Sequence, residues 1–203
     1  MTARVVHPIE ARSYRILRSR ADTGALPYWS RAVAERVVHA SADLDYLADL
    51  VLDEPALEAA AAALADGAPV VADAAMVAAG ITVRPSLVLV GDPRARDLAA
   101  ELGTTRSAAA MHLAAAEVGP GAVWVVGNAP TALEAVVDLA PRTRPALVVG
   151  LPVGFVGAVD SKARLRDAGI PAVSNASEKG GSAVAAAAVN ALLYGDPLEG
   201  ENT

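Results

Sequence analysis

The stretch Ala122-Val-Trp-Val-Val-Gly-Asn-Ala-Pro-Thr-Ala-Leu-Glu134 decides the fold. Residues 122–126 form a short apolar run without polar alternation, as expected of a strand that is covered on both faces. Gly127–Pro130 is a turn, and Thr131 and Glu134 have the spacing of a capping box, which predicts the start of a helix. The stretch therefore predicts a strand, a turn and a helix in succession.

The same succession repeats on both sides of this stretch. Four more short apolar runs are candidate strands: Pro69–Ala72, Leu87–Val90, Ala146–Val149 and Pro171–Val173. The predicted helices between and after the strands are Ala74–Ala79, Arg94–Leu102, Arg106–Glu117, Thr131–Leu139, Ser161–Asp167 and Ser182–Leu193. This alternation is typical of an α/β protein with a mainly parallel, doubly wound sheet.

The first third of the chain is predicted to be helical. Three helical stretches are expected there: Arg31–His39 with Ser30 as its N-cap, a stretch after Ser41 that includes Leu44–Val51, and Glu58–Ala65, which Gly67 ends. We expect one domain over residues 1–203, with a helical part at 1–66, an α/β part at 67–195 and a tail at 196–203.

The composition excludes several kinds of chemistry. The 203 residues include no cysteine and three histidines, so disulfides, thiolate nucleophiles, zinc sites with cysteine ligands and iron–sulfur clusters are excluded. His7, His39 and His112 each lack a second histidine at ligand spacing. We therefore expect no metal site.

The charge is unevenly distributed along the chain. The net charge of −6 argues against bulk binding of nucleic acid. Residues 1–40 nevertheless carry seven arginines against three acidic residues, a sum of +4. Such an end is either a local anion site or a solvated surface.

No membrane span or targeting segment is expected. The longest uncharged stretches have 16 residues and contain Gly, Pro or Asn, whereas a membrane-spanning helix needs about 20 apolar residues. Residues 1–12 lack the apolar run of a signal peptide. We expect a cytoplasmic protein.

The turns after the predicted strands are where a ligand would bind in this fold class. None has the spacing of a nucleotide-binding motif. The segment Lys179-Gly-Gly-Ser182 has two interpretations. Its free N–H groups, hydroxyl and ammonium suit a carboxylate or phosphate, but it is equally a tight turn with a serine N-cap.

His39 is the histidine best placed for chemistry. It closes a predicted helix beside Arg36, Ser41 and Asp43, where the helix dipole favours a protonated imidazole. A structural role stays open for His39 at this point. His7 and His112 are expected to be structural.

Taken together, segments along nearly the whole chain resemble one family. They are Pro8-Ile-Glu-Ala-Arg-Ser-Tyr-Arg-Ile-Leu17, Arg36-Val-Val-His-Ala-Ser-Ala-Asp43, Asp73-Ala-Ala-Met-Val-Ala-Ala-Gly80, Thr105-Arg106, Gly127-Asn-Ala-Pro-Thr-Ala-Leu133, Gly150-Leu-Pro-Val-Gly-Phe-Val156, Ser161-Lys162, Gly180-Gly-Ser182 and Asn190-Ala-Leu192. In this order they resemble the precorrin-8X methylmutases of cobalamin biosynthesis, including the cobalt-precorrin-8 enzymes.

The resemblance implies a homodimeric, Rossmann-like isomerase that uses no cofactor. Such an enzyme moves a methyl group of the tetrapyrrole precorrin-8X from C-11 to C-12 and gives hydrogenobyrinic acid. By resemblance His39 is the catalytic acid and Ser13 binds substrate. Arg106, which follows the paired threonines of the family, binds substrate as well. Carboxylates of the substrate would then use the helix start formed by Lys179, Gly180, Gly181 and Ser182.

Two departures from the family pattern leave alternatives open. Ser177-Glu178-Lys179 stands where the family has basic residues, and Tyr28-Trp29 replaces a Pro-Leu pair. The glutamate favours an alternative in which the protein binds or carries a corrinoid without converting it. Fold class alone favours a nucleotide-using enzyme, against which the missing phosphate motif counts.

Overall fold

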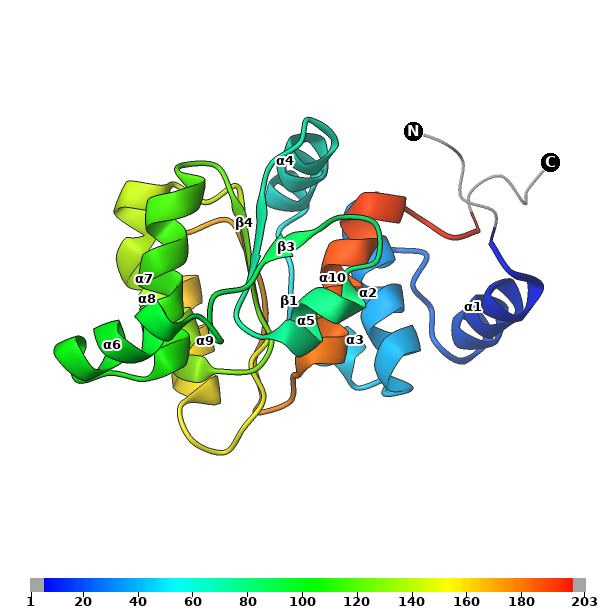
Figure 1. Ribbon diagram of the computed structural model, residues 1–203. Helices are drawn as coiled ribbons and strands as arrows, with labels where there is room; N and C mark the ends of the chain where they lie inside the picture. The colour runs from blue at the N-terminus through cyan, green and yellow to red at the C-terminus, as the bar shows by residue number, and fades with distance from the viewer. Residues whose placement is uncertain (1–5, 199–203) are drawn as a thin grey trace.

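A six-stranded sheet forms the centre of the computed structural model, which describes residues 6–198 (Figure 1). Its strands lie in the order β1-β6-β5-β4-β2-β3. All neighbours are parallel except β1 and β6, which are antiparallel. The strands are β1 (Leu50–Val51), β2 (Val70–Ala72), β3 (Ser86–Leu87), β4 (Val123–Val126), β5 (Leu147–Gly150) and β6 (Ala172–Asn175).

The sheet confirms the predicted fold class. Each of the five predicted strands overlaps a strand of the sheet, from β2 to β6. The predicted helices after residue 67 are confirmed as α5 (Ala75–Gly80), α6 (Pro93–Leu102), α7 (Arg106–Val118), α8 (Pro130–Thr143), α9 (Ala158–Asp167) and α10 (Ser182–Tyr194).

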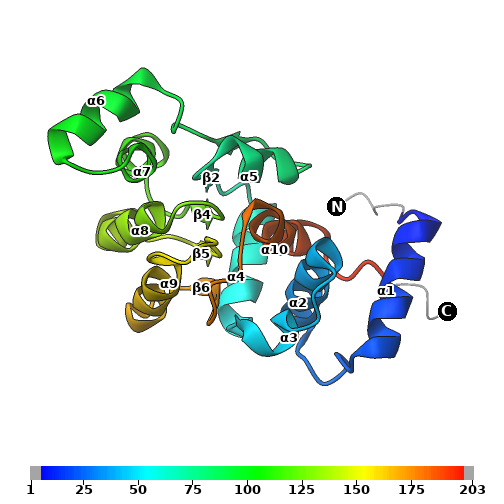
Figure 2. The same cartoon turned by 90° about the horizontal axis from the view of Figure 1, so that it is seen from below.

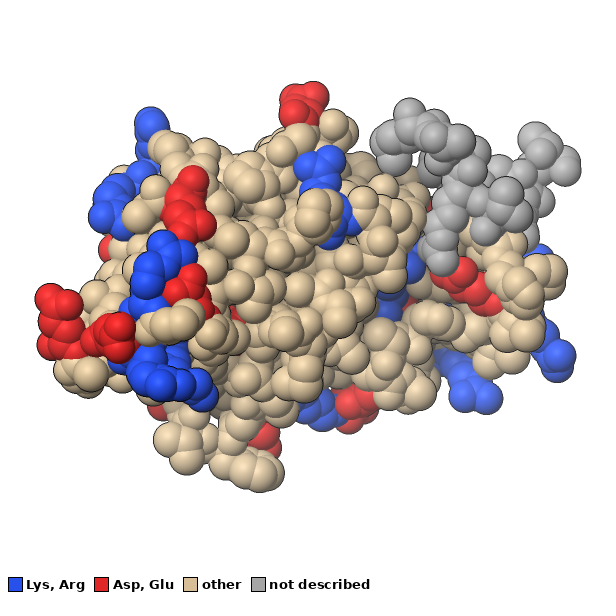
Figure 3. Space-filling view, in the orientation of Figure 1, with Lys and Arg blue, Asp and Glu red and all other residues tan. Residues whose placement is uncertain are grey.

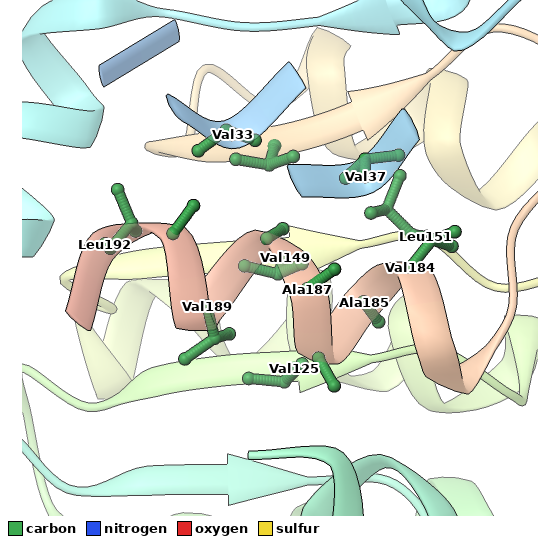
Figure 4. Close-up of a cluster of buried hydrophobic side chains, with 14 of the residues drawn as sticks. Val33, Val37, Val125, Val149, Leu151, Val184, Ala185, Ala187, Val189 and Leu192 are labelled. Atoms are coloured by element: carbon green, nitrogen blue, oxygen red, sulfur yellow. The ribbon is translucent and has the colours of Figure 1, made fainter. Parts of the chain in front are cut away.

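Helices cover both faces of the sheet, which is why the strands are apolar throughout. Val123, Val125 and Val149 face α2 (Tyr28–Ser41), α4 (Glu54–Ala65), α5 and α10, whereas Trp124 and Val148 face α6 to α9. Figure 4 shows α10 between the sheet and α2, with apolar side chains on both of its sides. The molecule therefore has two apolar cores, one on each face of the sheet.

The remaining helices lie at the edge of this arrangement. In Figure 2, α1 (Pro8–Arg20) lies outside α2, on the side away from the sheet. The short helix α3 (Tyr46–Asp49) follows α2 and leads into β1. On the face shown in Figure 3, the charged side chains gather mainly at the two ends of the molecule, over α6 and α7 and around α1.

The predicted helix over Leu44–Val51 is wrong. Residues 46–49 form one helical turn, and Leu50 and Val51 pair with Asn175 and Ser174 of β6. The Asp49 carboxylate accepts hydrogen bonds from the amides of Ala176 and Ser177, at 3.0 and 2.8 Å. These contacts with a distant segment hold residues 50 and 51 beside β6 as a strand. The helix therefore ends at Asp49 and does not continue as predicted.

Two predicted helix caps are also wrong. Helix α2 begins at Tyr28, and the amide and hydroxyl of Ser30 both donate to the Glu54 carboxylate at 2.7 Å. Helix α8 begins at Pro130, and the Thr131 hydroxyl bonds that of Thr105 at 2.8 Å. The Glu54 carboxylate therefore occupies the start of α2, and Thr131 faces Thr105 where a cap of α8 was expected.

Candidate active site

The carboxyl edge of the parallel strands gathers the turns that were predicted to bind ligands. Asp73, at the end of β2, accepts hydrogen bonds from the amides of Gly127, Asn128 and Ala129 at 2.8–3.1 Å. Burial raises the pKa of Asp73, although the three amides oppose this shift. A Cβ atom added to Gly127 would lie 3.0 Å from Cα of Ser182. The starts of α8 and α10 therefore lie against each other at this edge.

His39 lies in the last turn of α2, at the end of the molecule where the carboxyl edge of the sheet lies. Val37, one half-turn earlier, lies near Leu151 and Val184 in Figure 4, close to where α10 begins. Nδ1 of His39 lies 2.9 Å from the Ser13 hydroxyl oxygen. The His39 ring is stacked on the ring of Tyr14, with 4.8 Å between centroids and 15° between planes. Two neighbouring residues of α1 thus fix the orientation of an exposed imidazole.

A small cavity opens beside this histidine. It has a volume of about 160 Å³ and is lined by Ser13, Ile16, Leu17, Arg20, Val38, His39, Ala42 and Leu44. Larger cavities lie elsewhere, such as one of about 430 Å³ between the end of α8 and the segment 168–171. That one is at the amino edge of the sheet, away from the helix starts, so it does not fit the usual ligand position of this fold class.

The Lys179–Ser182 turn is packed directly on the loop that follows β5. A Cβ atom on Gly180 would lie 2.3 Å from the Leu151 carbonyl oxygen, so only glycine fits there. The amide of Gly181 donates to the same oxygen at 2.8 Å. The β5 loop contains Phe155, the chain's single phenylalanine, whose exposed fraction is 96%. Ser182 is the first residue of α10, with Gly181 as the N-cap.

Lys162, on α9, stabilises this turn through hydrogen bonds. Its fully buried ammonium donates to Asn175 Oδ1 at 2.9 Å, to the Lys179 carbonyl at 2.8 Å and to the Ser177 carbonyl. Burial lowers the pKa of Lys162 to about 8. Asp49 also binds this segment. The hydrogen bonds that the Asp49 carboxylate accepts outweigh the effect of its burial, so the pKa of Asp49 is lowered.

The Lys179 ammonium is engaged by two carboxylates. It lies 2.7 Å from Asp43 and 2.9 Å from Asp45, in the connection between α2 and α3. Hydrogen bonding to these partners raises the pKa of Lys179 and lowers that of Asp43. The ion pairs join the end of the His39 helix to the Gly-Gly-Ser turn, and a substrate carboxylate at Lys179 would have to compete with them.

Arg106 opens α7, on the opposite face of the sheet from the helices that carry His39 and Ser13. It is exposed at the first turn of α7, where Thr105 bonds Thr131 at the start of α8. Figure 2 shows α7 and α8 on one side of the sheet and α2 on the other. Within one chain the structure therefore brings His39 and Ser13 together, joins them to the Lys179 turn through Asp43, and leaves Arg106 across the sheet.

Several residues that build the site were missed by the sequence-based prediction. Tyr14 and Asp49 were not singled out, and Lys162 was noted only within a family segment. One signal was available, since Lys162 is one of only two lysines and lies in a predicted helix near the site turns. The partners of Asp49 had no local signal, because they are more than 120 residues away.

The described part of the chain gives two further findings on ligands and membranes. Within residues 6–198, no three or more His, Asp or Glu side chains are grouped so that they could hold a metal ion. Over the same residues, no helix has both the length and the apolar character needed to cross a bilayer.

Known proteins resemble this chain over nearly its whole length. The family model described as precorrin-8X methylmutase matches residues 8–195. Precorrin-8X methylmutase from Sinorhizobium sp is 40% identical over 91% of this chain and 92% of its own length. Cobalt-precorrin-8 methylmutase from Salmonella typhimurium is 39% identical over 92% and 93% of the two chains.

A solved structure agrees with these sequence matches. The crystal structure of precorrin-8X methyl mutase from Thermus thermophilus superimposes with a TM-score of 0.83 at 35% identity, covering 91% of this chain and 93% of that one. The resemblance inferred from the ordered segments is thereby confirmed. The chain belongs to the precorrin-8X methylmutase family.

Proposed function

We propose that this protein is an isomerase of cobalamin biosynthesis that acts in the cytoplasm. It converts precorrin-8X to hydrogenobyrinic acid by moving a methyl group from C-11 to C-12. Membership of the family carries this proposal, since the family model spans residues 8–195. A methyl shift within one molecule requires a ring held still and a proton on a ring nitrogen that biases the π-system.

His39 is the general acid of this proposal. An imidazole has an ordinary pKa of about 6.5, so it can supply a proton near neutral pH. Because Nδ1 bonds the Ser13 hydroxyl, we assign the transferred proton to Nε2. When Nε2 gives up its proton, Nδ1 keeps its own and still donates to Ser13. The contact with Ser13 therefore persists through the transfer, and the ring need not reorient.

The substrate's carboxylates are assigned to the helix start and to cationic side chains. The amides of Gly180 and Ser182 lie at the start of a helix of 13 residues, whose N-terminus favours negative charge. The amide of Gly181 already donates to the Leu151 carbonyl, so Gly181 contributes through the close approach of its backbone. Lys179 and Arg106 would add charge-assisted hydrogen bonds. Ser13 contacts substrate from the wall of the His39 cavity in this proposal, in addition to orienting the histidine.

Two copies of the chain are proposed to form the complete site. The cavity beside His39 holds about 160 Å³, whereas even drug-sized ligands occupy sites of roughly 300–1,000 Å³. Arg106 opens α7, which lies on the opposite side of the sheet from α2, the helix that carries His39 (Figure 2). A homodimer would enlarge the cavity with a surface of the second copy. Sedimentation of the purified protein as a monomer would contradict this part of the proposal.

The test of function is conversion of substrate by matched histidine variants. We expect His39→Ala to remain folded and to lose at least about 100-fold in kcat, because general acid catalysis contributes roughly 10²–10⁴-fold. His112→Ala removes an imidazole from α7, on the other side of the sheet, and should keep its turnover. Conversion is followed by the appearance of the hydrogenobyrinic acid absorption spectrum.

Each other outcome of this experiment has a definite meaning. Unchanged turnover in His39→Ala contradicts the general-acid assignment. Binding of precorrin-8X by the wild type without any spectral change favours the corrinoid carrier, the alternative that Glu178 suggested. Since relatives of both names match at 39–40% identity, the assay includes the cobalt-containing substrate.

A further inference from the structure

Helix α1 orients His39 but has few apolar contacts of its own. Three of its 13 residues are buried: Ala11, Tyr14 and Leu17. It lies outside α2, away from the sheet (Figure 2). Yet Ser13 and Tyr14, which contact the His39 ring, both belong to it. The position of the imidazole therefore depends on whatever fixes α1 on α2.

Arg18 links α1 to a buried carboxylate of α2. Its Nε and Nη2 donate to both oxygens of Glu35, at 2.8–3.2 Å. The Glu35 side chain is fully buried and also accepts from the Thr23 hydroxyl. A two-pronged contact between guanidinium and carboxylate fixes orientation as well as distance. It is thus suited to setting how α1 lies on α2.

The spacing along both helices ties this contact to His39. Tyr14 and Arg18 are four residues apart on α1, and Glu35 and His39 are four residues apart on α2. Residues with this spacing lie on one face of a helix, about one turn apart. Tyr14 meets His39 while Arg18 meets Glu35, as in two antiparallel helices held at two points. A shift at the Arg18 end therefore moves the Tyr14 end.

Asp196, which follows the end of α10, also binds Arg18. Its carboxylate lies 2.8 and 2.9 Å from Nη2 of Arg18 and 3.1 Å from Nη2 of Arg31 on α2. Its own amide donates to the Tyr28 hydroxyl at 3.3 Å. The residue thus joins α1, α2 and the end of α10, whose other end carries the Gly-Gly-Ser turn.

We propose that Arg18, Glu35 and Asp196 are positioning residues that hold α1 so that Ser13 and Tyr14 fix the His39 ring. The link to catalysis rests on the proposed role of His39. The positioning itself can be measured without turnover, since the stacked Tyr14 ring displaces the NMR signals of the His39 ring protons.

The experiment compares two substitutions among these three residues with a matched control. Arg18→Met removes both carboxylate contacts, and Asp196→Asn weakens one while leaving the contact with Glu35. The control, Arg94→Met, breaks exposed ion pairs with Asp92 and Glu117 at the other end of the molecule. The Tyr14→Leu variant supplies the His39 signal without the stack, and His112 serves as an internal reference.

We expect the His39 signals of Arg18→Met and Asp196→Asn to move toward those of Tyr14→Leu, with the larger shift in Arg18→Met. Turnover of Arg18→Met should fall by about 10- to 100-fold, as for a misplaced catalytic group. Arg94→Met should keep both the signal and the turnover of the wild type.

Wild-type His39 signals in folded Arg18→Met would overturn the proposal. If Arg18→Met does not fold, Asp196→Asn decides, and unchanged His39 signals in it would overturn the proposal equally. Displaced signals with unchanged turnover would support the positioning by Arg18 and contradict the general-acid role of His39. The two proposals therefore fail in different ways.

Discussion

At the scale of single residues, Lys162 is a buried charge that holds the Lys179–Ser182 turn through hydrogen bonds. Burial lowers its pKa from 10.5 to about 8. The folded chain then releases this proton at a lower pH than the unfolded chain does. Between pH 8 and 10.5 the unfolded state binds more protons, so the contribution of Lys162 to the free energy of unfolding rises with pH over this range.

Lys162→Met makes this effect measurable. We expect the free energy of unfolding of the wild type, minus that of Lys162→Met, to increase by about 2 kcal/mol between pH 7.5 and 9.5, since one pKa unit corresponds to roughly 1.4 kcal/mol. Urea unfolding of both proteins at several pH values gives the difference, in which groups common to both cancel. A difference that is constant with pH would show that Lys162 stays fully protonated.

Sequence reasoning on single residues placed His39 correctly near the end of a helix. The register of this helix is visible in the valines before His39, and the last turn of a helix is a favourable place for an imidazolium. The contacts of Ser13 and Tyr14 with His39 depend on how α1 crosses α2, and no pattern within either helix encodes that. The ion pairs of Lys179 with Asp43 and Asp45 were hidden for the same reason.

At the scale of elements, the close contact between the β5 loop and the Gly180 turn allows a sharp test. A Cβ atom at Gly180 would overlap the carbonyl oxygens of Leu151 and Pro152, at 2.3 and 2.7 Å, whereas one at Gly91 meets nothing within 4 Å. We expect Gly180→Ala to lower the free energy of unfolding by about 1–3 kcal/mol. Gly91→Ala should stay within about 0.5 kcal/mol of the wild type.

The measurement for this pair is chemical denaturation, accompanied by titration with the substrate. Gly180→Ala should also bind substrate more weakly, because the turn must move away from the β5 loop. Equal stability of the two alanine variants would mean that the turn is free to shift without loss.

The elements that were predicted correctly are those with a strong local pattern. Short apolar runs followed by turns gave β2 to β6, because strands buried on both faces need apolar side chains at every position. β1 was missed because two residues carry no period, and their partner, β6, is more than 120 residues away. The caps of α2 and α8 were wrongly predicted because Ser30 binds Glu54 and Thr131 binds Thr105, both of which come from other segments of the chain.

At the scale of the whole molecule, α1 and α10 should differ in local stability. Three residues of α1 are buried, against nine of α10, from Val184 to Leu192. A segment with few buried contacts opens at lower free energy than the core does. We expect amides of α1 to exchange with deuterium at least about tenfold faster than those of α10, as measured by mass spectrometry.

Arg18→Met sharpens the exchange experiment. It should speed exchange in α1 further and leave the middle of α10 unchanged, since the apolar contacts of α10 do not involve Arg18. Exchange of α1 as slow as that of α10 would show that the two helices open only together, in a single global event.

The exposed phenylalanine at the β5 loop gives the molecule a natural spectroscopic label. Phe155 is the chain's single phenylalanine, and its loop is tied to the Gly-Gly turn by the amide of Gly154, which donates to the Glu178 carbonyl at 3.1 Å. Growth on fluorophenylalanine would therefore introduce one fluorine nucleus per chain, at the rim of the candidate site and without any mutation. The NMR resonance of this fluorine is expected to change when the macrocycle binds. It can be followed in solutions where the absorption of the corrinoid obscures optical probes.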